Sequence, residues 1–169
     1  ADRVSLIKTS YPSPLLLYAG RLSQEKDLEV LLRAYALVRI HHPSVHLALA
    51  GSGPEEDALR SLVRHLDVED GVTFLGHLPW EDLRTLYNSA DVFCLTSGGE
   101  SQGLVIGEAK ACGLACVVVD EAGAGEQISH GEDGILLRSC DDRDDLTKNF
   151  ARALRRLLDD DDLRGRLAQ

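Results

Sequence analysis

Short apolar runs alternate with longer amphipathic stretches along most of the chain. The apolar runs predict buried strands at residues 14–20, 45–51, 71–76, 91–97 and 116–120. The stretches with apolar residues three or four positions apart predict helices at residues 26–40, 52–66, 79–90, 103–113 and 142 to about 158, with a weaker unit at 125–137. This alternation is typical of an α/β fold with a doubly wound, Rossmann-like parallel sheet. We find no internal repeat or linker, so residues 1–169 are expected to form a single domain.

The loops that follow the predicted strands share a small-residue composition. Each contains two or more of Gly, Ser and Pro, and they span residues 20–27, 51–56, 76–81, 96–103 and 120–126. Glycine allows backbone N–H groups to come close to a ligand. Because doubly wound sheets bind ligands outside the C-terminal ends of their strands, we expect the site to lie among these loops.

Composition narrows the classes of function. The chain of 169 residues is 44% hydrophobic and 27% charged, which is ordinary for a globular domain. A net charge of -10 argues against nucleic acid as a partner, and the apolar runs are too short to cross a bilayer. The four cysteines lack paired metal-ligand spacing and are expected to be reduced core thiols of a cytosolic protein: Cys94, Cys112, Cys116 and Cys140. The absence of methionine, even at position 1, indicates a fragment of a longer protein.

The sequence does not match the motifs of dinucleotide-binding, P-loop, metal-binding or nucleophile-elbow sites. The stretch "GSGPEE" has Glu56 where a dinucleotide fingerprint needs its third glycine, and no P-loop is present. His42 and His46 have the spacing of two helical metal ligands, but Pro43 lies between them, so we expect no metal site. No serine or cysteine occupies a nucleophile elbow.

The loop "GRLSQEKD" carries two cations, Arg21 and Lys26, where a helix is predicted to begin. The positive end of the helix dipole disfavours cations there, unless an anionic ligand is bound between them. We therefore predict a diphosphate site. The alternative is ion pairing with the acidic neighbours Glu25, Asp27 and Glu29.

The stretch "ESQGLVIGEAKACG" places Glu100 and Glu108 on either side of a predicted helix start. Ionised carboxylates only accept hydrogen bonds, so they suit the hydroxyl groups of sugars. The free N–H groups of Gln102, Gly103 and Leu104 suit an anion between them. Hydroxyl groups on both sides of an anion describe a nucleotide sugar. The alternatives are a glycosidase-type acid and base pair, or surface and capping carboxylates.

Taken in order over residues 14–137, these motifs resemble those of the group 1 family of retaining glycosyltransferases. The resemblance rests on "GRLSQEKDLEVLLRA", "LALAGSGPEEDAL", "VTFLGHLPWEDLRTLYNSADVFCLTS" and the two glutamates of "ESQGLVIGEAKACG". It implies one half of a two-domain GT-B enzyme. This half is the C-terminal, donor-binding domain, with further helices over 142–169, and the N-terminal acceptor-binding domain is absent from the chain.

The resemblance also implies roles for individual residues. Arg21 and Lys26 would hold the donor diphosphate, Glu100 the transferred sugar and Glu108 the ribose. The remaining substrate-binding positions are Gly20, Gly51 and Gly53 beside the nucleotide, Gly76 and His77 at the base, and Ser101, Gln102, Gly103 and Leu104 around the phosphates. The sequence departs from the usual family pattern at Gln102, Lys110 and Ala115.

The implied reaction is transfer of a hexose from a nucleoside diphosphate sugar, such as a UDP or GDP sugar, with retention at the anomeric carbon. No metal or other cofactor is expected. The isolated chain is expected to bind donor weakly without transferring it, and the missing domain would reach any membrane-associated acceptor from the cytoplasm. Two alternatives stay open, namely a nucleotide-sugar epimerase of related fold and a non-enzymatic α/β binding module.

Overall fold

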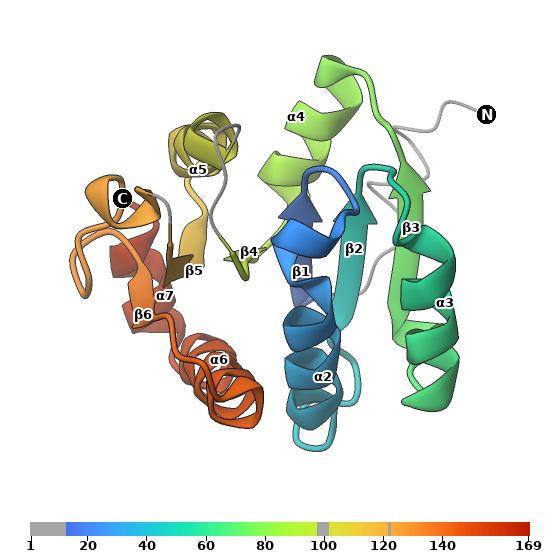
Figure 1. Cartoon of the computed structure of the whole chain (residues 1–169). Coiled ribbons are helices and arrows are strands. Elements are labelled where there is room, and N and C mark those ends of the chain that lie inside the picture. Colours follow the sequence, from blue (N-terminus) through green and yellow to red (C-terminus); the bar gives the residue numbers. More distant parts are fainter. Residues whose placement is uncertain (1–12, 98–101, 122) are drawn as a thin grey trace.

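The computed structural model describes residues 13–97, 102–121 and 123–169. In this part of the chain, parallel strands form a six-stranded sheet in the order β3-β2-β1-β4-β5-β6 (Figure 1). The strands are β1 (Leu15–Ala19), β2 (His46–Ala50), β3 (Val72–Gly76), β4 (Val92–Leu95), β5 (Ala115–Asp120) and β6 (Ile135–Arg138). The chain reverses its direction of winding between β1 and β4. The predicted doubly wound, Rossmann-like sheet is therefore confirmed.

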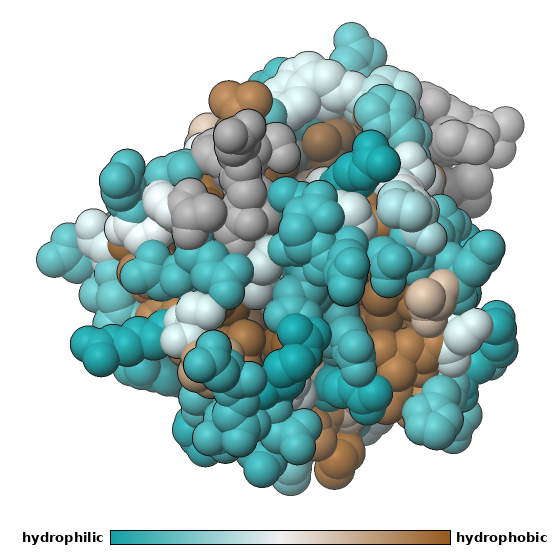
Figure 2. Space-filling model, viewed as in Figure 1, coloured by the Kyte–Doolittle hydropathy of each residue, from teal (hydrophilic) through white to brown (hydrophobic). Residues whose placement is uncertain are grey.

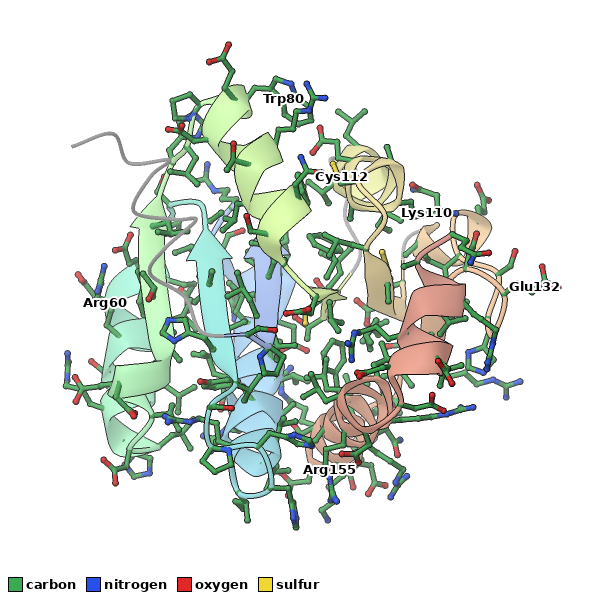
Figure 3. The ribbon with its side chains drawn as sticks, turned by 180° about the vertical axis from the view of Figure 1, so that it is seen from behind. Arg60, Trp80, Lys110, Cys112, Glu132 and Arg155 are labelled. Atoms are coloured by element: carbon green, nitrogen blue, oxygen red, sulfur yellow. The ribbon has the colours of Figure 1, made fainter. Side chains whose placement is uncertain are left out.

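Helices cover both faces of this sheet. They are α2 (Leu28–Arg39), α3 (Glu56–His65), α4 (Trp80–Ser89), α5 (Gln102–Ala111), α6 (Arg143–Asp159) and α7 (Asp161–Leu167), with 3-10 turns η1 (Gln24–Lys26), η2 (Glu69–Gly71) and η3 (Ala124–Glu126). Helices α2 and α3 lie in front of the sheet in Figure 1, and α4 lies in front of it in the reversed view of Figure 3, whereas α5 lies beyond the end of β5 in both views. Helix α6 packs along α2. None of the helices in the described ranges is both long and apolar enough to cross a membrane.

The core lies in and around the central strands, whose side chains are buried on both faces. Leu16 and Leu17 of β1, like Val117 and Val118 of β5, are fully buried. Such continuous burial is expected of a parallel sheet covered by helices on both sides. The face shown in Figure 2 is mostly hydrophilic, with hydrophobic residues visible between α2 and α3.

The prediction of free cysteine thiols is confirmed for all four positions, but the prediction that they lie in the core is right for only two. All four thiols are free, and Cys94 and Cys116 lie in the core on β4 and β5. Cys112 is half-buried and Cys140 is exposed. Cys112 directly follows α5, and Cys140 lies in the turn before α6, so neither belongs to a buried strand.

Helix α3, predicted from residue 52, begins at Glu56, and two further helix boundaries differ from the prediction or refine it. The helix predicted from Lys26 begins at Leu28, because Asp27 adopts a left-handed conformation with φ of 53° between η1 and α2. The predicted C-terminal helix is confirmed as α6 and is followed by the separate α7. Aspartates cap both helices: Asp142 accepts backbone N–H bonds at the start of α6, and Asp160 accepts one at the start of α7.

Candidate functional site

A pocket of about 370 Å³ opens at the C-terminal ends of β1, β2 and β3. We call it the strand-end pocket. The residues that follow the three strands form most of its wall: Gly20, Arg21, Gly51, Ser52, His77 and Leu78. Ala19 of β1, Ala50 of β2, Leu83 of α4 and Val105 of α5 complete it. The pocket therefore lies beside the β1–β4 reversal, where doubly wound sheets bind their ligands. Four predicted site residues meet here, namely Gly20, Arg21, Gly51 and His77.

Close backbone packing forms the floor of the strand-end pocket. Gly51 has φ of 147°, and a Cβ atom there would overlap the carbonyl oxygen of Gly20. The N–H of Gly51 donates to the carbonyl of Gly76 at 2.8 Å. A Cβ atom on Gly53 would overlap the carbonyl of Leu22. Gly53 and Gly76 thus support the loops without lining the pocket, and their predicted contacts with a nucleotide stay predictions.

The two predicted diphosphate ligands lie in different environments. Arg21 is exposed and lines the strand-end pocket. The hydroxyl of the buried Tyr18 donates to the Arg21 carbonyl at 2.8 Å, and burial raises the pKa of Tyr18, which keeps it a donor. Lys26, in contrast, is only 5% exposed. Among the described residues, the only buried side-chain polar atom without a partner is Arg155 Nε, so the buried part of Lys26 is its apolar stem.

The ion-pair alternative is supported only by longer-range interactions among the described residues: the hydrogen bond from Ser23 lowers the pKa of Glu25, and the charges of Lys26 and Arg21 lower it further. In the ranges that the structure covers, neither Arg21 nor Lys26 forms an ion pair. Each acidic neighbour has another partner: Ser23 for Glu25, Arg143 for Asp27 and Arg33 for Glu29. Asp27 and Glu29 therefore have other cationic partners, whereas Glu25 interacts with Arg21 and Lys26 without forming a salt bridge to either.

Two residues that the sequence analysis did not single out hold the cation-bearing loop in place. Thr96 and Ser97, which directly follow β4, are 1% and 3% exposed. The Thr96 hydroxyl donates to the Lys26 carbonyl at 2.9 Å, and the Ser97 hydroxyl donates to the Glu25 carbonyl. The available signal was a Thr-Ser pair at the end of a fully apolar strand, where hydroxyl groups need a buried partner.

Thr96→Val is expected to disturb this support without changing side-chain shape. The substitution leaves the Lys26 carbonyl unpaired and should lower the free energy of unfolding by about 1–3 kcal/mol. Urea denaturation measures this loss. Thr85→Val is the matched control, because the Thr85 hydroxyl donates to the Glu81 carbonyl of its own helix at 3.0 Å. Equal losses for the two variants would contradict a special role of Thr96.

Glu108 lies on α5 beside the strand-end pocket but does not line it. Its carboxylate accepts a hydrogen bond from the Tyr87 hydroxyl at 3.1 Å. Glu108 faces a second hollow of about 500 Å³, which we call the α4–α5 groove. This groove is lined by Trp80, Arg84 and Asn88 of α4 and by Leu104, Glu108 and Cys112 on the α5 side. Figure 3 labels Trp80 and Cys112 on these two walls. Val105 lies three residues before Glu108, so neighbouring surfaces of one helix serve the two hollows.

The remaining predicted residues are only partly covered. Glu100 and Ser101 lie outside the described residues. Gln102 and Gly103 are the first residues of α5, which confirms the predicted helix start. Val105, in the first turn of α5, reaches the strand-end pocket, so the positive end of the helix lies next to that pocket. Leu104 is 73% exposed in the α4–α5 groove.

Comparison with known proteins identifies the family. Residues 7–169 match the family described as "Glycosyl transferases group 1". The chain belongs to the group 1 glycosyltransferases. It is 37% identical over 145 residues to glycogen synthase of Mycobacterium tuberculosis. The aligned region covers 86% of the chain and 34% of that enzyme. This group 1 chain thus spans about a third of the length of the curated relatives it matches.

Solved structures agree with this assignment. Anabaena HepE in complex with UDP-glucose is 27% identical and superposes with a TM-score of 0.81, over 98% of the chain and 44% of that protein. The C-terminal domain of the group 1 family protein LpcC from Francisella tularensis superposes with a TM-score of 0.82 at 21% identity, over 94% of the chain and 82% of that domain. At that identity the likeness concerns the fold. The group 1 chain accordingly has the fold of a GT-B glycosyltransferase domain and superposes on the C-terminal domain of LpcC.

Proposed function

We propose that the chain is the donor-binding part of an enzyme that transfers a sugar from a nucleoside diphosphate sugar, with retention at the anomeric carbon. The strand-end pocket carries this proposal. It contains Gly20, Arg21, Gly51 and His77 at the C-terminal ends of the strands, where such folds bind nucleotides. The similarity to HepE, solved with UDP-glucose, supports a nucleotide sugar as the ligand.

In this proposal, the parts of the donor divide among the described elements. The base occupies the strand-end pocket near His77, and the diphosphate lies between Arg21, Lys26 and the start of α5. Glu108 accepts hydrogen bonds from the ribose, and Glu100 holds the transferred sugar. The fixed position of Lys26 supports this arrangement, since burial of its stem restricts where its ammonium group can meet a phosphate.

The same groups would promote departure of the diphosphate. Negative charge grows on the β-phosphate oxygen as its bond to the anomeric carbon breaks, and preorganised cations and helix N–H groups stabilise that charge. The acceptor oxygen bonds to the anomeric carbon on the same face, and its proton passes to the departing phosphate oxygen. With Arg21 and Lys26 in this role, neither a divalent metal nor a protein nucleophile is required.

The acceptor is proposed to bind elsewhere in the complete enzyme. The chain covers about a third of its curated relatives, so an N-terminal domain would supply the acceptor site in the cytoplasm. Calorimetric titration of the folded chain with UDP, GDP and ADP tests the donor site. We expect measurable binding of at least one nucleotide and no transfer. Absence of binding to all three would contradict the proposal, and conversion of donor without acceptor by the complete enzyme would indicate an epimerase.

A further inference from the structure

The Tyr87 hydroxyl reaches from α4 to the Glu108 carboxylate on α5. Tyr87 is fully buried, and its ring packs against Phe93 of β4 with centroids 5.9 Å apart. Its hydroxyl lies 3.1 Å from Glu108 Oε2. A tyrosine has few rotatable bonds, and the core fixes this one, so the position of its hydroxyl is well defined.

We infer that Tyr87 is a positioning residue that holds Glu108 ready for the ribose hydroxyls; this rests on the proposed function of Glu108. The Glu108 side chain is only half-buried at the α4–α5 groove, so it has rotational freedom to lose on binding. The bond from Tyr87 engages Oε2, and none of the residues that the structure describes donates a hydrogen bond to Oε1, which is left for a ligand hydroxyl. Fixing the carboxylate before binding removes part of the entropy cost of ordering it.

Tyr87 is suited to this role because it stays protonated. Burial raises the pKa of its hydroxyl, and the negative charge of Glu108 raises it further. The hydroxyl therefore donates to Glu108 throughout the neutral pH range. The competing interpretation is that the bond only satisfies a buried hydroxyl group. The two interpretations differ in what they predict for a nucleotide that lacks ribose hydroxyls.

Calorimetric titration with UDP and with 2′,3′-dideoxy-UDP separates these interpretations. Tyr87→Phe keeps the ring and its packing, and we expect it to weaken UDP binding roughly two- to tenfold while leaving dideoxy-UDP binding unchanged. Glu108→Ala should abolish the preference of the protein for UDP over dideoxy-UDP. Adding Tyr87→Phe to Glu108→Ala should then cause no further loss, because the carboxylate to be positioned is gone.

A matched variant accounts for effects on stability alone. Tyr35 is also fully buried, and its hydroxyl contacts the carbonyls of Val45 and Gly71 at 2.8 Å, outside both hollows. Tyr35→Phe should lower the free energy of unfolding and leave the preference for UDP intact. If Tyr87→Phe weakens both nucleotides equally, or neither, the inference about Tyr87 is wrong while the proposed function stands. If the wild-type protein binds UDP and dideoxy-UDP equally well, Glu108 does not bind the ribose hydroxyls. If the wild-type protein does not bind UDP, the proposed donor site is itself wrong.

Discussion

Lys26→Ala is expected to weaken UDP binding about tenfold to a hundredfold, with little effect on uridine. Lys26 is 5% exposed and forms no ion pair with the residues that the structure describes. A charge-assisted hydrogen bond to phosphate contributes about 1.5–3 kcal/mol, and alanine removes it. Uridine lacks the phosphates, so its affinity should hardly change. Calorimetric titration with both ligands measures the difference.

A control separates this effect from a general loss of positive charge. Lys148 on α6 is exposed and lies outside the lining of the strand-end pocket, so Lys148→Ala should leave UDP affinity unchanged. Urea denaturation of Lys26→Ala measures any loss of stability separately from the loss of UDP affinity. An unchanged dissociation constant for UDP would assign Lys26 a purely structural role.

Gly51→Ala is expected to lower the free energy of unfolding by about 2–5 kcal/mol, the largest effect on stability that we anticipate. The substitution places a Cβ atom onto the Gly20 carbonyl and forces a non-glycine residue to adopt φ of 147°. Strained backbone and overpacking each typically cost 1–3 kcal/mol. Because the Gly20 and Gly76 loops must move, the strand-end pocket should also lose its shape. Urea denaturation with linear extrapolation measures the change.

The matched control for this prediction is Gly165→Ala. Gly165 is exposed on α7, and a Cβ atom there would have no neighbour within 4 Å. Alanine has the higher helix propensity, so this variant should gain up to about 1 kcal/mol. Gly51→Ala with wild-type stability would show that the β1 and β2 loops are packed less closely than the structure indicates.

The fold and the place of the pocket followed from sequence because both rest on local patterns. Apolar runs of strand length and glycine-containing loops were enough to predict the order of the elements and the end of the sheet at which the strand-end pocket lies. The details that were missed depend on partners distant in sequence. Thr96 lies 70 residues from the Lys26 carbonyl that it supports, and Tyr87 lies 21 residues from Glu108. Helical spacing alone could not show that the Glu108 carboxylate would meet α4.

The burial of Lys26 was missed for a related reason. The sequence predicted that Lys26 opens a helix at the mouth of the sheet. Asp27 instead adopts a left-handed conformation, so the helix begins at Leu28. The Thr96 hydroxyl donates to the backbone carbonyl of Lys26. The burial of the Lys26 stem thus accompanies a backbone conformation and a hydroxyl contact that the sequence did not indicate.

A crystal structure of the chain soaked with UDP tests the central claim most directly. We predict that uracil lies in the strand-end pocket beside His77 and that diphosphate oxygens lie within hydrogen-bond distance of Arg21 and Lys26. UDP ordered at another surface, or bound in the pocket with its phosphates directed away from both cations, would contradict the account.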